Sequence, residues 1–259
     1  MIQGYLKTLV RTRLSRNQNF LCAVIGPTGS GKSYYALAMG ESLDPSFSVG
    51  NLAFTPDDFV QLVRDGEKGS VIIFDDAGLG MPSRKWYDMN NQLLSYVLQS
   101  CRSHNQIICF TMPSMSFIDV AARRLFHCVF SMVSYGKAKI YMLRSDAYEG
   151  NIYREFPHTL QDSGLGYERS VTVEHILIPK PSDALIGPYE EKKTEYLDTL
   201  YSSLHGMLEP QQKSGSRDAV VLAMRAKGMS LREIANILDV HHSTIDNILK
   251  KDRKLHTKL

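Results

Sequence analysis

The segment from Gly26 to Ser33 has the spacing G-x-x-x-x-G-K-S, which suits the binding of phosphate groups. Gly29 and Gly31 let the backbone turn so that successive N–H groups point inward toward an anion. The ammonium of Lys32 suits the β- and γ-phosphates, and the hydroxyl of Ser33 suits a Mg²⁺ ligand. We predict that a nucleotide is bound by Gly26, Pro27, Thr28, Gly29, Ser30, Gly31, Lys32, Ser33 and Tyr34.

The residues on either side of this loop support the prediction. An apolar run at 21–25 precedes the loop, and a segment of helical character at 34–41 follows it. A phosphate-binding loop needs a strand before it and a helix after it, since the positive N-terminal end of the helix also faces the anion. The alternative is a glycine-rich turn that has a lysine beside it by chance.

Two adjacent carboxylates, Asp75 and Asp76, follow the apolar run 71–74 directly. Ligands of an open α/β sheet bind at the carboxyl ends of its strands, so both carboxylates are predicted to face the loop. Asp75 suits holding Mg²⁺ through water, and Asp76 suits polarising an attacking water. Loop carboxylates capping a turn before Gly78 are the structural alternative. A small-molecule kinase, which needs no such base, is the chemical alternative to nucleotide hydrolysis.

Apolar runs alternate with helical segments through the first half of the chain, which predicts an α/β protein with a mainly parallel central sheet. Further on, two alternating runs around a Glu-Gly-Asn turn predict a β-hairpin that extends the sheet. A long amphipathic helix is predicted at 181–208. The strands are expected at 21–25, 47–54, 71–74, 106–111, 127–133, 139–144, 152–156 and 170–178, with helices at 32–41, 56–65, 88–104 and 116–126.

The end of the chain has the pattern of a small all-α unit with a helix-turn-helix. Ser230 and Glu233 have the spacing of a capping box, and small or apolar residues recur so that two short helices can cross closely. Ser243 is expected to cap the second helix. Asp239 stands at a turn position that is usually glycine and that needs a left-handed backbone. Aspartate tolerates this conformation better than most residues.

The charge of this region favours a polyanionic partner. Between residues 210 and 259, ten Lys and Arg residues face five Asp and Glu residues, although the whole chain has a net charge of only +3. We predict binding to double-stranded DNA. A helical hairpin used for protein contact is the alternative. The predicted DNA-binding residues are Arg232, His242, Ser243, Thr244, Asn247, Lys250 and Lys251.

Composition places the chain among globular proteins of one or two domains. It has 259 residues, of which 43% are hydrophobic and 22% charged. We expect an ATPase-type domain at 1–206 (core about 18–135, extension 136–206), a linker at 207–216 and the helical unit at 217–259. The basic N-terminal segment is expected to be a solvated arm. The absence of a signal-like segment and of paired cysteines predicts a cytoplasmic protein without a membrane span.

The order of the motifs resembles the additional-strand P-loop ATPases, and residues 71–133 look like FtsK/HerA-type DNA-pumping ATPases. Zonula-occludens-toxin-type phage ATPases and their relatives on archaeal mobile elements are the most similar of these. The resemblance covers roughly residues 15–135, and rests on Asp75-Asp76, Arg84, the segment 101–105 and Thr111-Met112-Pro113. Those relatives more often have Glu at 76 and Gln at 112. The helix-turn-helix looks like the resolvase/Hin type.

This resemblance implies a RecA-like P-loop NTPase fold with ATP and Mg²⁺ as cofactors. It also implies an oligomer in which an arginine acts in trans, with Arg84, Arg102, Arg123 and Arg124 as candidates and the pair Arg123 and Arg124 favoured. Thr111 or Ser114 is the implied sensor of the γ-phosphate. Surface arginines favoured by a helix dipole are the plainer explanation for each arginine alone.

The implied function is Mg²⁺-dependent ATP hydrolysis coupled to moving or remodelling double-stranded DNA for a virus, plasmid or integrated element. A helicase-loader or transposition-helper ATPase has the same motifs and stays open. An ATP-gated DNA-binding regulator also stays open, because slow hydrolysis by the shorter Asp76 suits a switch.

Overall fold

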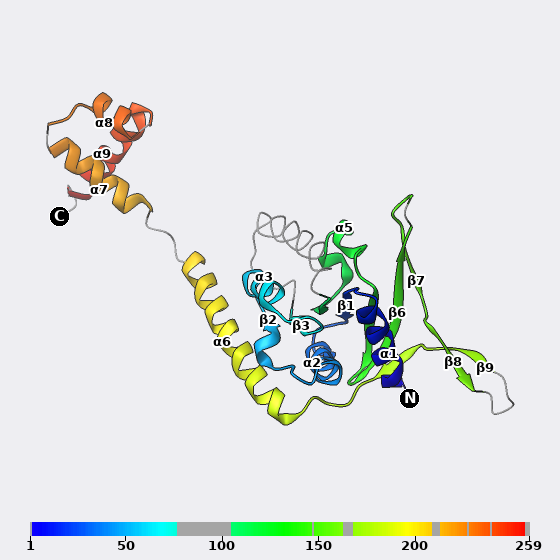
Figure 1. Cartoon of the computed structure of the whole chain (residues 1–259). Coiled ribbons are helices and arrows are strands. Elements are labelled where there is room, and N and C mark those ends of the chain that lie inside the picture. The colour runs from blue at the N-terminus through cyan, green and yellow to red at the C-terminus, as the bar shows by residue number, and fades with distance from the viewer. Residues whose placement is uncertain are drawn as a thin grey trace. The chain divides into compact units, whose positions relative to one another are not determined.

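The computed structural model divides the chain into two compact units, Met1–Tyr201 and Ser202–Leu259 (Figure 1). It describes residues 2–76, 105–146, 148–162, 168–208, 213–226, 228–238 and 240–256. Within these ranges, side chains are not described for 2, 3, 162, 204–208, 213–219 and 251–256. The helix predicted at 88–104, the candidates Arg84 and Arg102, and Asp239 lie outside the described residues.

The first unit is built on an eight-stranded sheet with the order β10-β6-β5-β1-β4-β3-β2, in which β7 pairs with β6. Strands β1 to β5 pair in parallel, and β6, β7 and β10 are antiparallel. Strand β4 lies between β1 and β3. The described strands are β1 Phe20–Ile25, β2 Leu52–Ala53, β3 Val71–Phe74, β4 Ile107–Met112, β5 Cys128–Ser134, β6 Lys137–Ser145, β7 Ile152–Glu155, β8 His158–Asp162, β9 Glu168–Thr172 and β10 His175–Leu177.

The helices of the first unit cover both faces of this sheet. They are α1 Ile2–Ser15, α2 Lys32–Leu43, α3 Pro56–Asp65, the single turn α5 Val120–Arg123 and α6 Asp183–Leu208, which runs past the boundary between the units. Two short 3₁₀ turns are η1 Val49–Asn51 and η3 Met115–Phe117. The predicted fold class, an α/β protein with a mainly parallel sheet and a hairpin extension followed by a small all-α unit, is confirmed.

Alternation along the buried strands produces two apolar layers. In β1, Phe20, Cys22 and Val24 pack with α1, α2 and α6 on one face. Leu21 and Ala23 pack with α3 and α5 on the other face. Because both faces are covered, strands such as β3 and β4 are continuous apolar runs rather than alternating ones.

Four parts of the first unit differ from the sequence prediction. The strand predicted at 47–54 is reduced to β2, because Val49–Asn51 form the 3₁₀ turn η1. The N-terminal segment is not a solvated arm, because it forms α1 and buries Leu6 and Val10 against the core. The helix predicted at 116–126 is broken into η3 and α5, where the Asp119 side chain accepts from the Ala121 N–H and starts a new turn. The strand predicted at 170–178 divides into β9, which pairs with β8 in a separate hairpin, and β10.

The second unit has its own small core. Helices α7 Lys213–Ala226, α8 Leu231–Ile237 and α9 His242–His256 enclose Val221, Ile234, Ala235 and Ile245. The predicted capping box is present, because the Ser230 side chain accepts from the Glu233 N–H and the Glu233 carboxylate accepts from the Ser230 N–H. Helix α7 begins inside the range 207–216 that the sequence predicted as a linker.

Candidate functional site

The glycine-rich loop connects β1 to α2, as the motif requires. Gly29 and Gly31 have φ angles of +78° and +84°, in the left-handed region that side chains disfavour. Gly31 also takes the N-cap position of α2, and no side chain caps that end. The first N–H groups of α2 therefore lack a capping partner within the helix and carry its positive dipole end, which is the arrangement that binds anions.

Two side chains of the loop are suited to a bound anion. The Lys32 side chain is buried, and its ammonium donates to the Pro27 carbonyl at 2.9 Å. The Ser30 hydroxyl oxygen is buried and, among the described residues, has no hydrogen-bond partner. A buried hydroxyl without a partner is costly unless a ligand or water satisfies it. Triphosphate oxygens would accept from both groups, so these residues fit that ligand.

The predicted acidic pair lies at the carboxyl end of β3, in contact with the end of β4. Asp75 is 1% exposed and accepts from the Thr111 hydroxyl at 2.5 Å. The same hydroxyl accepts from the Asp76 N–H at 2.8 Å. Asp76 has a φ of +50°, so the chain turns sharply directly after Asp75. Thr111, the predicted γ-phosphate sensor, thus fixes the Asp75 carboxylate and the backbone of Asp76.

Helix α6 brings a cation to this acidic pair. The Lys193 ammonium lies 3.2 Å from Asp75 Oδ2 and 2.8 Å from Asp76 Oδ2, and its side chain is 22% exposed. It also donates to the Tyr189 hydroxyl at 3.0 Å. Two adjacent carboxylates repel each other, and a shared ammonium relieves that repulsion. Sequence reasoning missed both α6 residues, which are more than 110 positions away from the aspartates along the chain.

Tyr189 connects the acidic pair to the loop. Its hydroxyl donates to Asp75 Oδ2 at 2.8 Å, and the Ser33 side chain lies beside it. The Tyr189 hydroxyl therefore lies between the two residues predicted to hold Mg²⁺. The loop serine, Asp75 and Asp76 converge at one edge of the sheet because β1 and β3 both run parallel to β4.

Burial and charge set the protonation of the two α6 residues. Burial, followed by the charge of Asp75, raises the pKa of Tyr189 above its ordinary value, so its hydroxyl keeps the proton it donates. Burial alone would lower the pKa of Lys193. The charge of Asp75 and hydrogen bonds to Asp76 and Tyr189 outweigh it and raise this pKa, so the ammonium stays charged.

Both candidate trans-acting arginines donate hydrogen bonds to backbone carbonyls of the same chain. Arg123 Nε donates to the Ile118 carbonyl at 2.6 Å, and Arg124 Nε donates to the Gly150 carbonyl at 2.9 Å. Both arginines flank the end of α5, and neither is among the residues that contact the acidic pair. A role for either in a neighbouring subunit stays a prediction.

The predicted DNA-reading residues share the exposed side of α8 and α9. Arg232, His242, Ser243, Asn247 and Lys250 are exposed and Thr244 is half-buried; Lys251 follows in α9. Ser243 does not cap the second helix as expected, because α9 begins one residue earlier at His242. Instead, the Ser243 hydroxyl contacts His241 Nδ1 at 2.8 Å. Lys250 pairs with Asp246 at 2.7 Å on the surface.

Comparison with known proteins supports this geometry at the C-terminal end. Residues 221–252 match a protein family described as a helix-turn-helix domain. The C-terminal helices carry a helix-turn-helix. The match covers the end of α7, all of α8 and most of α9, so the helix-turn-helix predicted from sequence is confirmed. No curated protein matches the chain in sequence.

Two solved structures resemble part of the chain. The N-terminal domain of zonular occludens toxin from Neisseria meningitidis has 16% identity and a TM-score of 0.34, covering 53% of this chain and 94% of that one. A DNA polymerase III gamma subunit-related protein from Thermotoga maritima has 10% identity and a TM-score of 0.36, covering 51% of this chain and 45% of that one. Likeness of this degree assigns no activity.

Among the described residues, no helix is long and apolar enough to cross a membrane.

Proposed function

We propose that this protein binds and hydrolyses ATP with Mg²⁺ in its first unit and binds double-stranded DNA through its helix-turn-helix. The observation that supports the first part is the convergence of Ser33, Asp75 and Asp76, with the Tyr189 hydroxyl bonded to Asp75 and lying beside Ser33. This places a hydroxyl and two carboxylates beside a lysine and a helix N-terminus, the set of groups that phosphoryl transfer needs.

In this proposal Ser33 and Asp75 hold Mg²⁺, and Asp76 orients the attacking water. A bound Mg²⁺ would neutralise charge that develops on the triphosphate. Lys32 leaves the Pro27 carbonyl and turns to the phosphates, since a charged acceptor bonds more strongly than a neutral carbonyl. The Lys193 ammonium releases the two carboxylates when the nucleotide and Mg²⁺ bind, because two cations so close together repel.

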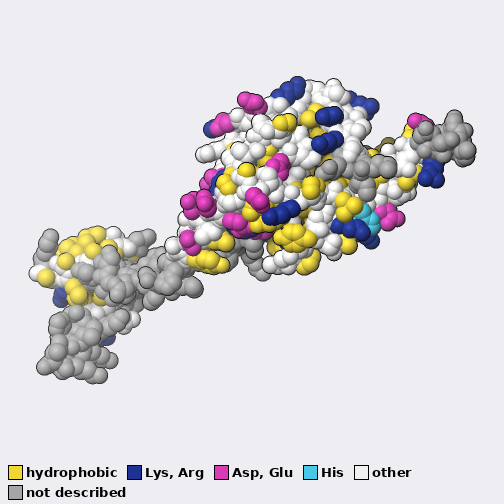
Figure 2. All heavy atoms as spheres, turned by 90° about the horizontal axis from the view of Figure 1, so that it is seen from below, with side chains coloured by type: hydrophobic (Ala, Val, Ile, Leu, Met, Phe, Trp, Pro, Cys, Tyr) yellow, Lys and Arg dark blue, Asp and Glu magenta, His cyan; other side chains and the backbone are white. Residues whose placement is uncertain are grey.

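The DNA part of the proposal rests on the second unit. Helix α9 would enter the major groove with its first turns, and Arg232, Lys250 and Lys251 would bind phosphates. On the face seen in Figure 2, Lys and Arg side chains of the first unit lie interspersed with Asp and Glu side chains. The described part of that face therefore carries charges of both signs.

We further propose that the protein moves or remodels DNA as a homo-oligomer for a virus, plasmid or integrated element. The helicase-loader or transposition-helper alternative differs only in its partner. The ATP-gated regulator is favoured by one observation, the engagement of both carboxylates by Lys193. A site closed by its own cation suits slow turnover.

Steady-state ATP hydrolysis with and without duplex DNA tests the proposal. A motor shows turnover stimulated by DNA and a ring in native mass spectrometry, whereas a regulator binds ATP with negligible turnover. Lys32→Ala should weaken ATP binding about ten- to a hundredfold, as for the loss of a charged hydrogen bond. Retained affinity in this variant would contradict the loop assignment.

Asp76→Ala separates hydrolysis from binding. It should bind ATP normally but lower turnover about a hundredfold or more, the usual contribution of a positioned base. Measured ATP affinity is the control for folding, since Asp76 is not expected to contact the ground-state nucleotide. Unchanged turnover would remove Asp76 from the mechanism.

A further inference from the structure

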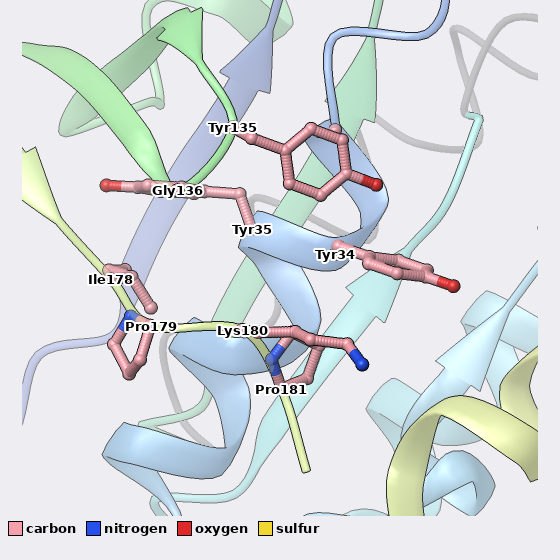
Figure 3. A pocket seen from close by; sticks show the side chains of 9 residues that line it. Tyr34, Tyr35, Tyr135, Gly136, Ile178, Pro179, Lys180 and Pro181 are labelled. Carbon is pink, nitrogen blue, oxygen red and sulfur yellow. The ribbon is translucent and has the colours of Figure 1, made fainter. Parts of the chain in front are cut away.

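A hollow beside the loop is lined mostly by aromatic and proline side chains (Figure 3). It has a volume of about 160 Å³, which is below the roughly 300–1,000 Å³ of pockets that hold a whole drug-sized ligand. It therefore suits one flat part of a ligand whose remainder binds elsewhere. Its lining comprises Gly31, Tyr34, Tyr35, Tyr135, Gly136 and residues 178–181.

The hollow is continuous with the loop. Gly31 belongs to the phosphate-binding motif, and Tyr34 stands in the first turn of α2. The Tyr135 ring lies so close to Gly31 that a Cβ atom there would come within 3.1–3.3 Å of three ring carbons. Glycine at this position thus serves both the loop backbone and the approach of the ring.

The strand order decides which end of a triphosphate faces the hollow. Strand β1 ends in the loop, and β4 and β3 lie on one side of it with the acidic pair. Strands β5 and β6 lie on the other side, and their connection carries Tyr135 and Gly136. The reacting γ-phosphate must lie near Asp75 and Asp76. The nucleoside end of a triphosphate lying across the loop therefore points toward β5 and the hollow.

The side chains of the hollow suit stacking. The rings of Tyr34 and Tyr135 pack edge to face, with their centroids 6.1 Å apart. The Tyr34 hydroxyl donates to Glu190 at 2.8 Å, which fixes that ring, while Tyr135 is 66% exposed and offers its face. Pro179 and Pro181 form the opposite wall (Figure 3). Aromatic faces of this kind bind nucleobases by stacking and tolerate any base.

We propose that this hollow binds the base of the nucleotide, with Tyr135 as the stacking residue. The proposal rests on the nucleotide-binding function proposed above and adds the site of the base. Among the residues that the structure describes, the lining holds no carboxylate or amide side chain that would read a base edge, and its Lys180 ammonium bonds Asp183 at 3.0 Å. The site therefore holds adenine and guanine about equally well.

Calorimetry with ATP, GTP and inorganic triphosphate tests this proposal, because inorganic triphosphate has no base. Tyr135→Ala should weaken ATP and GTP about tenfold, the effect of losing one base stack, and leave inorganic triphosphate unchanged. Tyr135→Phe should keep the affinity for all three ligands. Tyr153→Ala is the matched control, since it removes an exposed tyrosine of β7 that does not line the hollow.

Two results overturn the base site. Either the affinity of Tyr135→Ala for ATP equals that of the unaltered protein, or the affinities for ATP and inorganic triphosphate fall together, so that Tyr135 acts on the loop. A strong preference for ATP over GTP overturns the lack of base discrimination. Failure of the proposed function gives a different result. In that case, Lys32→Ala does not reduce the binding of any of the three ligands.

Discussion

At the residue scale, the site is defined by a cation that the protein supplies itself. Lys193 binds both carboxylates that are proposed to serve Mg²⁺ and water, and it stays charged because their attraction outweighs its burial. Thr111 and Tyr189 hold the Asp75 carboxylate from two other directions, and Thr111 also accepts from the Asp76 N–H. The aspartates are therefore held in one arrangement before any ligand binds, which lowers the cost of ordering them.

Lys193→Met tests whether this cation and Mg²⁺ exclude each other. Removing one nearby positive charge should lower the Mg²⁺ concentration for half-maximal ATP binding by about tenfold. Without ligand, the variant should lose about 3 kcal/mol of unfolding free energy, because Asp75 is left buried without its partner. Nucleotide binding across a Mg²⁺ titration and urea unfolding measure the two effects.

Arg144→Met is the control for this experiment. Arg144 pairs with Glu155 on the surface of the β6–β7 hairpin, and exposed pairs contribute about 1 kcal/mol or less. It should change neither the Mg²⁺ dependence nor the stability appreciably. An unaltered Mg²⁺ requirement in Lys193→Met would show that the ammonium and the metal do not compete.

At the element scale, contacts between elements far apart in the chain decide what each one does. Helix α6 was predicted as an amphipathic helix, and its buried side packs Tyr189 and Leu185 on the core. Lys192 on the same helix donates to the carbonyls of Val49 and Leu52 at the edge of the sheet. Helix α6 is thus fixed against the first unit by contacts of the residues that precede Lys193.

His127 joins three elements and makes stability depend on pH. Its Nδ1 accepts from the Leu21 N–H of β1 at 2.9 Å, directly before β5 begins. Burial and then the guanidinium of Arg13 on α1 lower the pKa of His127 to about 3. In the unfolded chain the imidazole takes up a proton near pH 6.5. The unfolded state therefore binds the extra proton between about pH 6.5 and pH 3, and acid favours unfolding.

Urea unfolding at several pH values checks this prediction. The contribution of His127 to stability should be complete above about pH 6.5 and fall by about 1.4 kcal/mol per pH unit below it. His127→Gln, which keeps an acceptor without the titration, should have a flatter profile in that window. Equal slopes in the two proteins would mean that His127 is accessible to protons in the folded state.

At the scale of the whole molecule, the chain consists of two units with separate cores. The first is organised by its sheet, and the second by the four buried residues between α7, α8 and α9. Because each core is complete in itself, the two proposed activities should be separable. This organisation suits a protein whose proposed nucleotide site and proposed DNA-binding helices belong to separate domains.

A shortened chain ending at residue 206 tests this separation. It should keep ATP affinity within about twofold and lose most of its duplex affinity, since phosphate and base contacts are proposed only for the second unit. Fluorescence anisotropy with labelled duplex and calorimetry with ATP measure the two. Duplex affinity that persists would place the DNA site in the first unit.

Arg232→Ala in the full chain complements the shortened chain. If Arg232 binds a phosphate, its loss should weaken all duplex sequences alike and reduce the salt dependence of binding by about one charge. An effect restricted to one sequence would instead indicate a base contact.

The sequence by itself determined the local features of this protein. The loop motif, the acidic pair at the end of an apolar run, the capping box and the hairpin turn depend on residues only a few positions apart, so local rules predict them. The same rules failed where contacts between residues far apart in the chain decide the structure of a segment. The basic N-terminal segment contains Leu6 and Val10, but only the packed core explains why it is not solvated.

The tertiary structure alone decided how the site is completed. Lys193 and Tyr189 reach the aspartates across 114–118 positions of sequence, and Tyr135 reaches Gly31 across the sheet. Nothing in the spacing of these residues marks them, because lysines and tyrosines are common on any amphipathic helix or strand end. Their roles arise from the strand order, which places the ends of β1, β3 and β5 along one edge and leaves α6 to cover it.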